Sequence, residues 1–428
     1  MKTDITEHKD AVTGERYLSF RHKSGVKVLI CPNTYSTSCA VYTSDFGGAD
    51  TDFEYGGKKY GVPLGTAHFL EHKLFETEDS GDAFKLFSEL GADSNAFTSH
   101  QATSYTFTSS NDAFYESLKI LLDFVHKPHF TEASVSKERG IIEEEIKMYE
   151  DSPDNKSYYE LMRCLYKNRG VRYDVGGTPD TIKLITPEVL YFCHKVFYSP
   201  SNMVLIAAGD VDAEKIIAVM DGTVPCIKRS KTIKRIRQPE PDKAYKRSSR
   251  LYMDVSEPLF SFGIKDPDIE NKALMRRKSV ALSILSNLLF GESSAFYCDL
   301  YEKGLLSGDI DAGYYYGDDH AYFSVLGESR KPYTVKKRIY ETLDKAVAEG
   351  VDDASFELAK KIFYANYVYS MQNSQAVAYS LLSFYQSGDD MLKYPRLLSG
   401  IHAPFAVSCL KELYKKERSA YAVVLPIQ

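Results

Sequence analysis

The chain has 428 residues, of which 43% are hydrophobic and 26% charged, and its formal net charge is −6 at pH 7. This length exceeds what one hydrophobic core usually supports, so two or more domains are expected. The acidic balance argues against nucleic acid as the main partner. No apolar run approaches the roughly 18 residues of a membrane-spanning helix.

Short strands and amphipathic helices alternate along the first half of the chain. Residues 16–20 and 26–30 alternate apolar with polar side chains around a Ser24-Gly25 turn, which predicts a β-hairpin. A strand at 38–43 and a glycine-rich loop precede a helix that begins near Gly65. By their residue patterns, further helices are expected at 82–90, 114–125, 132–150 and 186–196, and further strands at 93–98, 103–108 and 202–210.

A similar order of elements starts again after a basic segment. Residues 228–241 are rich in Lys and Arg and contain two prolines, which favours a solvated linker over a nucleic-acid arm. Strands follow at 250–255, 259–264, 321–325 and 420–425, and helices at 271–289, 333–349 and 354–370. We predict an α+β fold of two homologous domains, residues 1–226 and 246–428, joined by a linker at 227–245. Each domain is expected to be a mostly antiparallel sheet packed with helices.

The cysteines give an expectation about the compartment. Seven are scattered along the chain without a Cys-x-x-Cys spacing, which is typical of reduced thiols, each a small buried residue. The N-terminal residues are polar and lack the apolar core of a signal peptide. A cytoplasmic location is therefore predicted.

The strongest chemical signal is the run His68-Phe69-Leu70-Glu71-His72. Histidines four residues apart project from one helix face, so both imidazoles can reach one metal ion. Glu71 lies beside that face, where a general base could hold an attacking water. The alternative is an ordinary helix with two buried or solvated histidines.

A zinc peptidase needs a third protein ligand and an open fourth position. Glu138 and Glu145 are seven residues apart in a predicted helix, so they share one face. Glu143 and Glu144 point elsewhere. A charge run of this kind often forms only a solvated helix face.

The His-x-x-Glu-His order is the inverse of the common zinc-peptidase order. The chain resembles the pitrilysin, insulin-degrading enzyme and mitochondrial processing peptidase family, particularly its bacterial members of similar length. In that family the later glutamate of such a pair binds the metal. The resemblance implies Zn2+ held by His68, His72 and Glu145, with Glu71 as catalytic base and Glu138 as a further catalytic-site carboxylate that orients a histidine or the water.

The resemblance extends along most of the first half of the chain. Residues 91–98 and 103–105 resemble the family's substrate-edge strand and its neighbour, which implies substrate binding by Asn95, Ala96 and Phe97. Residues 173–178 and 197–203 also match. The implied protein is a zinc metalloendopeptidase that forms half of a clam-shell chamber and cleaves extended peptides or unfolded segments.

The second half departs from the family pattern. An Arg and a Tyr that contact substrate in relatives correspond here to Tyr301 and Gly308. We therefore hypothesise that this chain is the zinc-bearing subunit of a heterodimer whose homologous partner supplies the Arg and Tyr. A homodimer is the alternative, as is substitution by one of the tyrosines at 314–316 or by Arg330.

Two other functions remain open from the sequence. The chain could be a non-catalytic zinc-binding scaffold or substrate-docking subunit, or a zinc hydrolase that acts on small amides. Among the other histidines, His126 and His129 have ligand-like spacing but are expected at the surface. His100 is predicted to lie in a substrate subsite.

Overall fold

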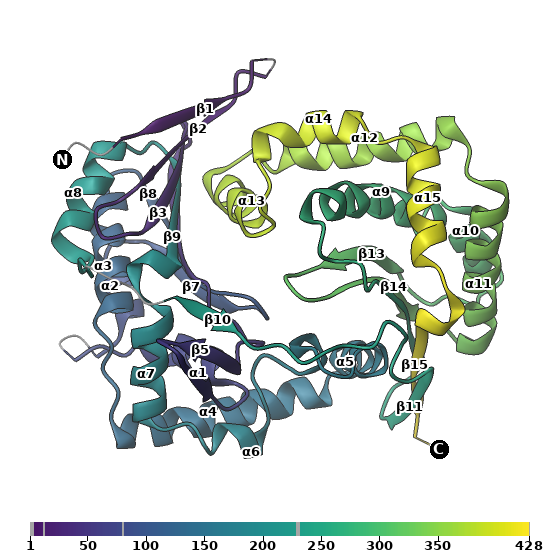
Figure 1. Cartoon of the computed structure of the whole chain (residues 1–428), viewed down its shortest axis with the longest axis horizontal. Coiled ribbons are helices and arrows are strands. Elements are labelled where there is room, and N and C mark those ends of the chain that lie inside the picture. The colour runs from purple at the N-terminus through teal and green to yellow at the C-terminus, as the bar shows by residue number, and fades with distance from the viewer. Residues whose placement is uncertain (1–3, 12, 79–80, 228–231, 428) are drawn as a thin grey trace. The chain divides into compact units, whose positions relative to one another are not determined.

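The computed structural model describes residues 4–11, 13–78, 81–227 and 232–427. The chain forms two compact units (Figure 1). Unit 1 comprises Met1–Ile146, Asp174–Ile236 and Val368–Lys393, and unit 2 comprises Lys147–Tyr173, Arg237–Tyr367 and Tyr394–Gln428.

Unit 1 is built on a seven-stranded sheet with the order β1-β2-β3-β9-β4-β8-β7. Its strands are β1 (Thr6–Lys9), β2 (Arg16–Arg21), β3 (Lys27–Pro32), β4 (Thr37–Ser44), β7 (Asp93–Thr98), β8 (Thr103–Ser110) and β9 (Met203–Gly209). β3 and β9 run parallel, and the other neighbours run antiparallel. A small sheet with the order β10-β5-β6 joins β5 (Asp52–Tyr55), β6 (Lys58–Gly61) and β10 (Ile233–Arg235).

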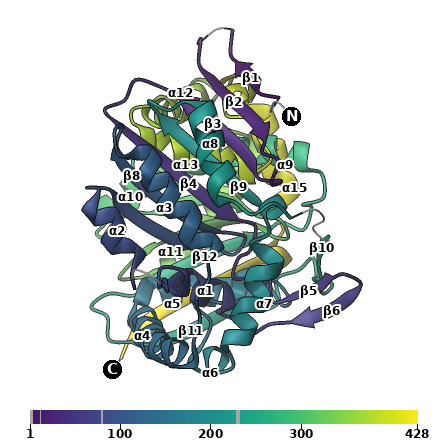
Figure 2. The same ribbon diagram turned by 90° about the vertical axis from the view of Figure 1, so that its left-hand side faces the viewer.

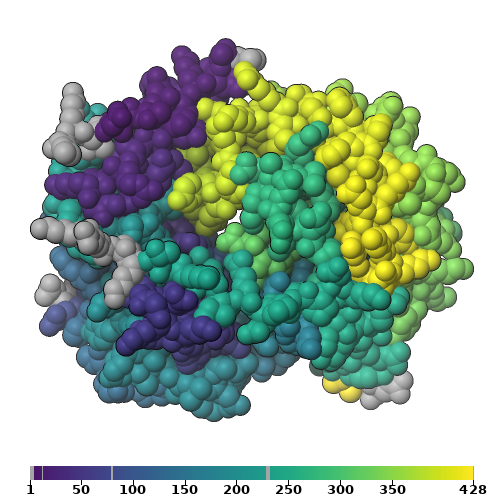
Figure 3. Space-filling view, viewed as in Figure 1, coloured from purple at the N-terminus to yellow at the C-terminus, as the bar shows by residue number. Residues whose placement is uncertain are grey.

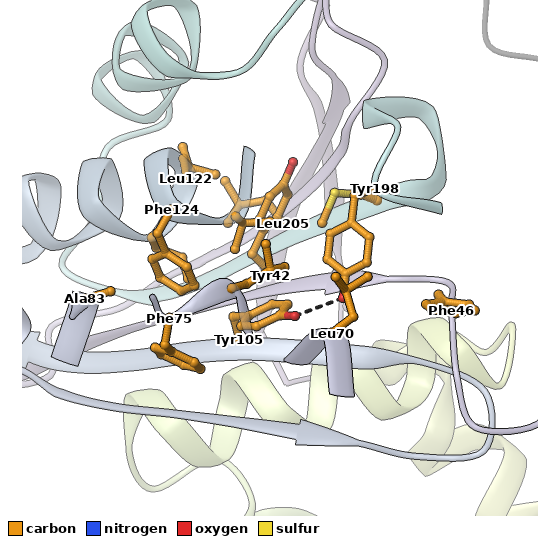
Figure 4. Close-up of a cluster of buried hydrophobic side chains, with 14 of the residues drawn as sticks. Tyr42, Phe46, Leu70, Phe75, Ala83, Tyr105, Leu122, Phe124, Tyr198 and Leu205 are labelled. Carbon is orange, nitrogen blue, oxygen red and sulfur yellow. Dashed lines mark hydrogen bonds between the residues drawn. The ribbon is translucent and has the colours of Figure 1, made fainter. Parts of the chain in front are cut away.

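The helices of unit 1 cover both faces of the large sheet. They are α1 (Thr66–Leu74), α2 (Ala83–Glu89), α3 (Phe114–His126), α4 (Glu132–Asp151, which continues into unit 2), α6 (Pro179–Ile182), α7 (Pro187–Phe197), α8 (Ala213–Thr223) and α13 (Ser374–Gln386). α3 packs against β8 and β4, whereas α13 packs against β4 and β9 from the opposite face (Figures 1 and 2). The core between the sheet and the α3 side is rich in aromatic rings, and within it Tyr105 and Tyr198 share a hydrogen bond of 2.9 Å (Figure 4).

Side chains also tie the α13 segment to the first strands. The Tyr17 hydroxyl donates to Asp390, the Tyr35 hydroxyl donates to the Met371 carbonyl, and Thr37 and Ser374 share a hydrogen bond. In Figure 3 the yellow-green atoms of the segment that carries α13 lie against the purple N-terminal strands. α13 is therefore an integral part of unit 1, although it lies far from the other elements in the sequence.

Unit 2 has a five-stranded sheet with the order β11-β15-β12-β14-β13. Its strands are β11 (Ser248–Met253), β12 (Leu259–Lys265), β13 (Asp311–Tyr316), β14 (Ala321–Glu328) and β15 (Ser419–Pro426). Its helices are α5 (Pro153–Leu165), α9 (Lys272–Phe290), α10 (Ala295–Glu302), α11 (Pro332–Glu349), α12 (Asp353–Tyr369), α14 (Tyr394–Ser399) and α15 (Ala403–Leu413). α5 packs against β12 and β15, as α13 packs against β4 and β9 in unit 1.

Five strands of unit 1, in the order β3-β9-β4-β8-β7, match the whole sheet of unit 2 in position and direction. The predicted α+β class and the repeated, mostly antiparallel sheet are thus confirmed. The units nevertheless exchange one helix each, because α5 comes from the first half of the chain and α13 from the second. An apolar sheet face must be covered, and each unit covers it with a helix from the other half.

Part of the predicted solvated linker is ordered against the units. Arg235 lies in β10 and pairs with Asp45 at 2.9 Å and with the buried Asp50 at 2.5 Å, both within unit 1. Glu240 pairs with the buried Lys265 within unit 2. These charges are held by partners because a buried ion without one is costly. Residues 228–231 lie outside the described residues.

The helical stretch Lys272–Glu302 is long and apolar enough to cross a membrane by length and composition, and 44% of its most apolar window is buried. Within it, α9 packs Met275, Leu282 and Leu285 into the core of unit 2. Core helices of folded proteins pass the same test of length and composition, so the stretch is weak support for a membrane span.

Candidate metal centre

Two glycines fix the start of α1, the helix that carries the His-x-x-Glu-His run. Gly65 precedes the helix at a φ of 90°, and a Cβ there would lie 2.5 Å from the Gly176 carbonyl oxygen. Gly177 has a φ of 79°, and its Cβ would lie 2.6 Å from the Leu64 carbonyl oxygen. Only glycine fits this left-handed geometry and close approach. The segment around residues 174–178 is thereby held against the start of α1.

One face of α1 packs into the core, and the two histidines lie on the opposite face. Phe69, Leu70 and Leu74 are fully buried in the core of unit 1, and Leu70 is drawn there in Figure 4. His68 and His72 keep 12% and 25% of their side chains exposed, so their rings remain accessible. Apolar burial therefore determines which way the imidazoles point.

His68 and His72 meet Glu145 of α4. The Nε2 atom of His68 lies 3.6 Å from Oε1 of Glu145, and Nε2 of His72 lies 3.4 Å from Oε2. Among the described residues, these three form the one group of ligand-type side chains whose ligand atoms lie close enough together to hold a metal ion. α4 thus presents Glu145, the glutamate that the resemblance pointed to, to both histidines.

The geometry fits zinc. Bonds of about 2.0–2.2 Å to nitrogen and oxygen in a tetrahedron separate neighbouring ligand atoms by about 3.4 Å. Each histidine nitrogen lies at close to this separation from one oxygen of Glu145, 3.6 Å from Oε1 for His68 and 3.4 Å from Oε2 for His72, and the three ligand atoms lie within 4.8 Å of one another. In addition, Oε2 of Glu145 is buried and has no hydrogen-bond partner among the described residues. A buried carboxylate oxygen without a hydrogen-bond partner, 3.4 Å from the Nε2 atom of His72, fits the role of a metal ligand.

Glu138 orients the second histidine. Its Oε1 lies 3.0 Å from Nδ1 of His72, one side of the ring, while Nε2 on the other side faces Glu145. Burial opposes a charge on His72, but the hydrogen bond to Glu138 and the nearby carboxylates outweigh burial and raise its pKa. For Glu138, burial is likewise outweighed by this hydrogen bond, and the pKa is lowered. An Nδ1–H donated to Glu138 leaves Nε2 free as a ligand.

Burial acts differently on the other two candidate ligands. It lowers the pKa of His68 to about 4, with a smaller contribution from His72. It raises the pKa of Glu145. His68 is therefore neutral at neutral pH, the form that binds metal.

Glu71 is held by the neighbouring edge strand. Its side chain is 8% exposed, and the Thr98 hydroxyl at the end of β7 donates a hydrogen bond to its Oε2. Burial raises the pKa of Glu71 above the usual value of a glutamate. A carboxylate with a raised pKa beside a metal position is suited to accept and return a proton.

A cavity of about 950 Å³ opens beside these groups. Glu71, His72 and Glu138 line one side of it, and Asn95 and Ala96 of β7 line another. Farther along, the wall contains the aromatic rings of Phe75 and Phe84, stacked with their centres 4.0 Å apart. The cavity is large enough for several side chains of a peptide.

β7 is the last strand of the unit 1 sheet, next to β8. Ser94, Ala96 and Thr98 are half-buried, whereas the alternate residues are exposed, as expected for a strand with two distinct faces. The Asn95 side chain accepts a hydrogen bond of 2.9 Å from the Ala96 amide. Phe97 is not in the wall of the cavity and instead meets the ring of Tyr379.

Sequence reasoning missed two contributors to this centre. Thr98 was inside a predicted strand, but its bond to Glu71 depends on how that strand lies against α1. Asp174 adds negative charge near Glu145, and its Oδ1 accepts a hydrogen bond of 2.9 Å from the Gly176 amide. The sequence signal that could have identified Asp174 was its position within residues 173–178, a segment that resembles the family.

Other expectations concern residues outside the centre. His126 is half-buried, with Nε2 2.7 Å from the Tyr42 hydroxyl, and His129 is partly exposed and lines the cavity. Not every cysteine is buried, because Cys226 and Cys298 are exposed.

The candidates for the missing Arg and Tyr lie in unit 2. Tyr301 is exposed, and Arg330 pairs with Glu257 at 3.0 Å. Tyr314 is buried, and its hydroxyl donates to Asp266 at 2.6 Å. Tyr314 is therefore committed to the interior of unit 2.

Comparison with known proteins gives the same picture in sequence and fold. Residues 62–178 match the profile of "Insulinase (Peptidase family M16)", and residues 184–363 match that of "Peptidase M16 inactive domain". The chain is 36% identical, over 83% of its length and 84% of the relative's, to an uncharacterized zinc protease, YmfH, of Bacillus subtilis. A putative M16-like peptidase from Alicyclobacillus acidocaldarius superposes with a TM-score of 0.91 at 28% identity, covering 100% and 99% of the two chains. A protease from Helicobacter pylori superposes with a TM-score of 0.85 at 20% identity, over 96% and 100% of the chains, and shares the fold.

Proposed function

Because this chain belongs to the insulinase family of peptidases, peptidase family M16, we propose that it is a zinc-dependent metalloendopeptidase. One observation carries the proposal: ligand-type atoms of His68, His72 and Glu145 lie within 4.8 Å of one another, with Glu71 one residue before His72 on the same helix. A non-catalytic scaffold would have no need of a buried base at this point.

Each residue of the centre has a distinct role in the proposed hydrolysis. Zinc, held by His68, His72 and Glu145, would polarise the scissile carbonyl and make a water acidic. Glu71 accepts the proton of the attacking water and returns it to the leaving amine. Glu138 holds the His72 ring through Nδ1. Thr98 holds the Glu71 carboxylate in place.

The substrate is an extended peptide that lies along β7. An edge strand offers a row of main-chain groups to which a peptide can bond as one further strand. Asn95 and Ala96 lie both on this strand and in the wall of the cavity, which supports the proposal. Folded proteins lack a free extended segment, so we expect short peptides and unfolded segments as substrates.

The decisive test of this function is the variant Glu71→Gln. It should retain zinc and the fold but lose hydrolysis of a fluorogenic peptide by about 10²–10⁴-fold, the usual contribution of a general base. Glu143→Gln on α4 is a control, because this glutamate is outside the metal group and the cavity wall. If Glu71→Gln cleaves as fast as the unchanged protein, the proposed mechanism is wrong.

We further propose that this chain acts with a homologous subunit. The profile matched by residues 184–363 is that of an inactive domain, and Tyr301 and Gly308 stand where relatives carry the Arg and Tyr. Co-purification from the native organism tests the idea. Full activity of this chain alone, as monomer or homodimer, would contradict it.

A second candidate function is a zinc-binding subunit that docks substrate without cutting it. The inactive-domain match of the second half is the observation that favours it. If the native complex hydrolyses the same peptide at an unchanged rate when its chain carries Glu71→Gln, substrate docking by this chain is supported over catalysis by it.

We also propose a cytoplasmic location. All seven cysteines are free, and burial raises the pKa of Cys31 and Cys193 to about 12, which keeps these thiols protonated and unreactive. Reduced cysteines are usual in the cytosol. Cell fractionation with an antibody tests the location.

A further inference from the structure

Arg235 of β10 closes a loop between β4 and β5, residues 45–50. Its Nε lies 2.5 Å from Oδ1 of the buried Asp50, and its Nη2 lies 2.9 Å from Oδ1 of Asp45. The Asp50 carboxylate also accepts a hydrogen bond of 3.0 Å from the Gly47 amide. A guanidinium presents several donors in a fixed planar geometry, so one arginine can hold both ends of the loop.

Loop 45–50 fits closely against the turn between β7 and β8. The Gly48 amide donates to the Ser99 carbonyl at 2.9 Å, and the next amide of the loop donates to the His100 carbonyl at 3.0 Å. A Cβ on Gly47 would lie 2.4 Å from the backbone of the turn, so no side chain fits between the two segments. The position of the loop therefore determines the position of the turn.

This turn adjoins the residue that holds the base of the proposed mechanism. Ser99 directly follows Thr98, whose hydroxyl donates to Glu71. The Thr98 hydroxyl also lies 3.3 Å from that of Thr103, and the Thr103 hydroxyl donates to the Phe46 carbonyl of the loop at 2.8 Å. Thr98 is thus connected to the loop through its chain neighbour and through its own side chain.

We propose that Arg235 is a positioning residue for Glu71. Its ion pairs fix loop 45–50, the loop fixes the end of β7, and Thr98 at that end fixes the Glu71 carboxylate. Among the described residues Arg235 belongs to neither the metal group nor the cavity wall, so it acts on the base only through these contacts. The role of Glu71 itself rests on the proposed function.

The kinetics of Arg235→Ala test the proposal. The variant should bind zinc as the unchanged protein does but hydrolyse a fluorogenic peptide with a kcat about 10–100-fold lower, because a small displacement of a catalytic group is costly. Arg237→Ala is the matched control and should keep its kcat, since Arg237 lies two residues farther along and pairs with Asp319 of unit 2 at 3.6 Å. An unchanged kcat in Arg235→Ala overturns the proposal.

A double-mutant cycle separates positioning from a general loss of stability. Thr98→Val removes the hydroxyl that holds Glu71. Adding Arg235→Ala to this variant should therefore lower kcat by less than about twofold further. If the effects of the two changes multiply instead, Arg235 acts independently of Thr98 and the proposal is wrong.

Hydrogen exchange followed by mass spectrometry gives a readout that does not depend on hydrolysis. Backbone amides of residues 93–105 should exchange faster in zinc-loaded Arg235→Ala than in the unchanged protein or in Arg237→Ala. Equal exchange in all three proteins overturns the proposal.

Arg235→Lys covers the case in which circular dichroism shows that Arg235→Ala does not fold. Lysine keeps the positive charge but lacks the planar fork that reaches both carboxylates. Its kcat and its hydrogen exchange should therefore change in the same direction as in Arg235→Ala, by a smaller amount. If Arg235→Lys behaves as the unchanged protein does in both measurements, the proposal is overturned.

The outcomes also separate this inference from the proposed function. If the unchanged protein cleaves no peptide but Arg235→Ala still speeds exchange in residues 93–105, the peptidase is contradicted and the link between Arg235 and the end of β7 stands. If the unchanged protein cleaves peptides but Arg235→Ala alters neither kcat nor exchange, the peptidase stands and the positioning role is wrong.

Discussion

The two units arrange five strands in the same order but use the junction between a helix and the edge strand differently. In unit 1, α1 follows β4 and presents Glu71 to Thr98 of the edge strand β7. The neighbouring His68 and His72 face Glu145, whose Oε2 lacks a hydrogen-bond partner among the described residues. This junction contains unsatisfied polar atoms and opens to a cavity.

In unit 2 the corresponding helix is α9, which packs on the edge strand β13. Lys278 of α9 pairs with Asp266 at 2.5 Å, and Asp266 also accepts the hydrogen bond from Tyr314 of β13. All three side chains are buried. The junction is closed by charges that satisfy one another.

The difference shows how one scaffold supports either a ligand site or a structural contact. Buried polar groups normally have partners, so the closed set of Asp266, Lys278 and Tyr314 fits a structural contact, whereas the Glu145 oxygen without a partner fits a ligand site. The similar strand order means that the distinction comes from side chains at one junction and not from the backbone.

The largest effect is expected from removing a ligand in unit 1. His68→Ala should reduce bound zinc, measured by elemental mass spectrometry, below detection and abolish peptidase activity. Lys278→Met at the corresponding junction of unit 2 should leave the zinc content unchanged. Zinc retained by His68→Ala would mean that the metal binds elsewhere.

The closed junction of unit 2 should respond in stability instead of zinc content. Asp266→Asn keeps the side-chain shape but leaves the buried Lys278 without a counter-charge, and should lower the free energy of unfolding by about 3–5 kcal/mol. Asp318→Asn removes the partner of the half-exposed Lys272 on the same helix, and should cost at most about 1 kcal/mol. Urea unfolding measures both. If both variants lower the free energy of unfolding equally, burial does not distinguish the Asp266–Lys278 pair from the Asp318–Lys272 pair.

A smaller effect is expected from Glu138, which supports the metal centre indirectly. Glu138→Ala should weaken zinc binding by about 10–100-fold, because the His72 ring loses its hydrogen bond. Competition with a chelating dye measures the affinity, and Glu143→Gln on the same helix should leave it unchanged. If Glu138→Ala binds zinc with unaltered affinity, Glu138 does not support the metal centre through His72.

The smallest effect concerns two half-buried histidines of unit 1, His126 and His194. Burial lowers the pKa of His126 to about 3 and that of His194 to about 4. His126 contacts Tyr42, and His194 contacts the Val125 carbonyl and stacks on Tyr198. Both histidines are therefore neutral in the folded protein.

As the pH falls, the unfolded chain protonates these histidines before the folded protein does. The free energy of unfolding is therefore unaffected by them above about pH 6.5 and decreases as the pH falls toward 4. From pH 6.5 to 5 each histidine should cost about 2 kcal/mol of stability. In His126→Gln, urea unfolding should show a correspondingly smaller loss between pH 7 and pH 5. The same pH dependence in both proteins would assign the loss to other groups.

The parts of the fold that were predictable depend on local patterns. The predicted hairpin corresponds to β2 and β3, and the predicted helix at 132–150 is α4, which ends one residue later. In contrast, α5, α13 and α15 were not predicted, and neither were the short strands β1, β5, β6 and β10. The four strands have only three or four residues each, too few for a periodic pattern to stand out, whereas the three helices have 11 to 13 residues with buried apolar faces that were not assigned from the sequence.

The candidate site divides in the same way. Residue spacing alone placed His68 with His72, and Glu138 with Glu145, on shared helix faces, because helical periodicity is a local property of the backbone. That these two faces meet was implied by a resemblance, and the separations of 3.4 and 3.6 Å come from the packing of α1 and α4.

Only the tertiary structure decided which distant side chains complete each junction. Thr98 reaches Glu71, Asp266 joins Lys278 to Tyr314, and Tyr379 meets Phe97 across most of the length of the chain. No spacing rule links such residues, since their contact follows from which helix covers which sheet face. The sequence by itself determined the chemistry that α1 and α4 can offer, and the packing of these helices with each other and with β7 determined which side chains surround it.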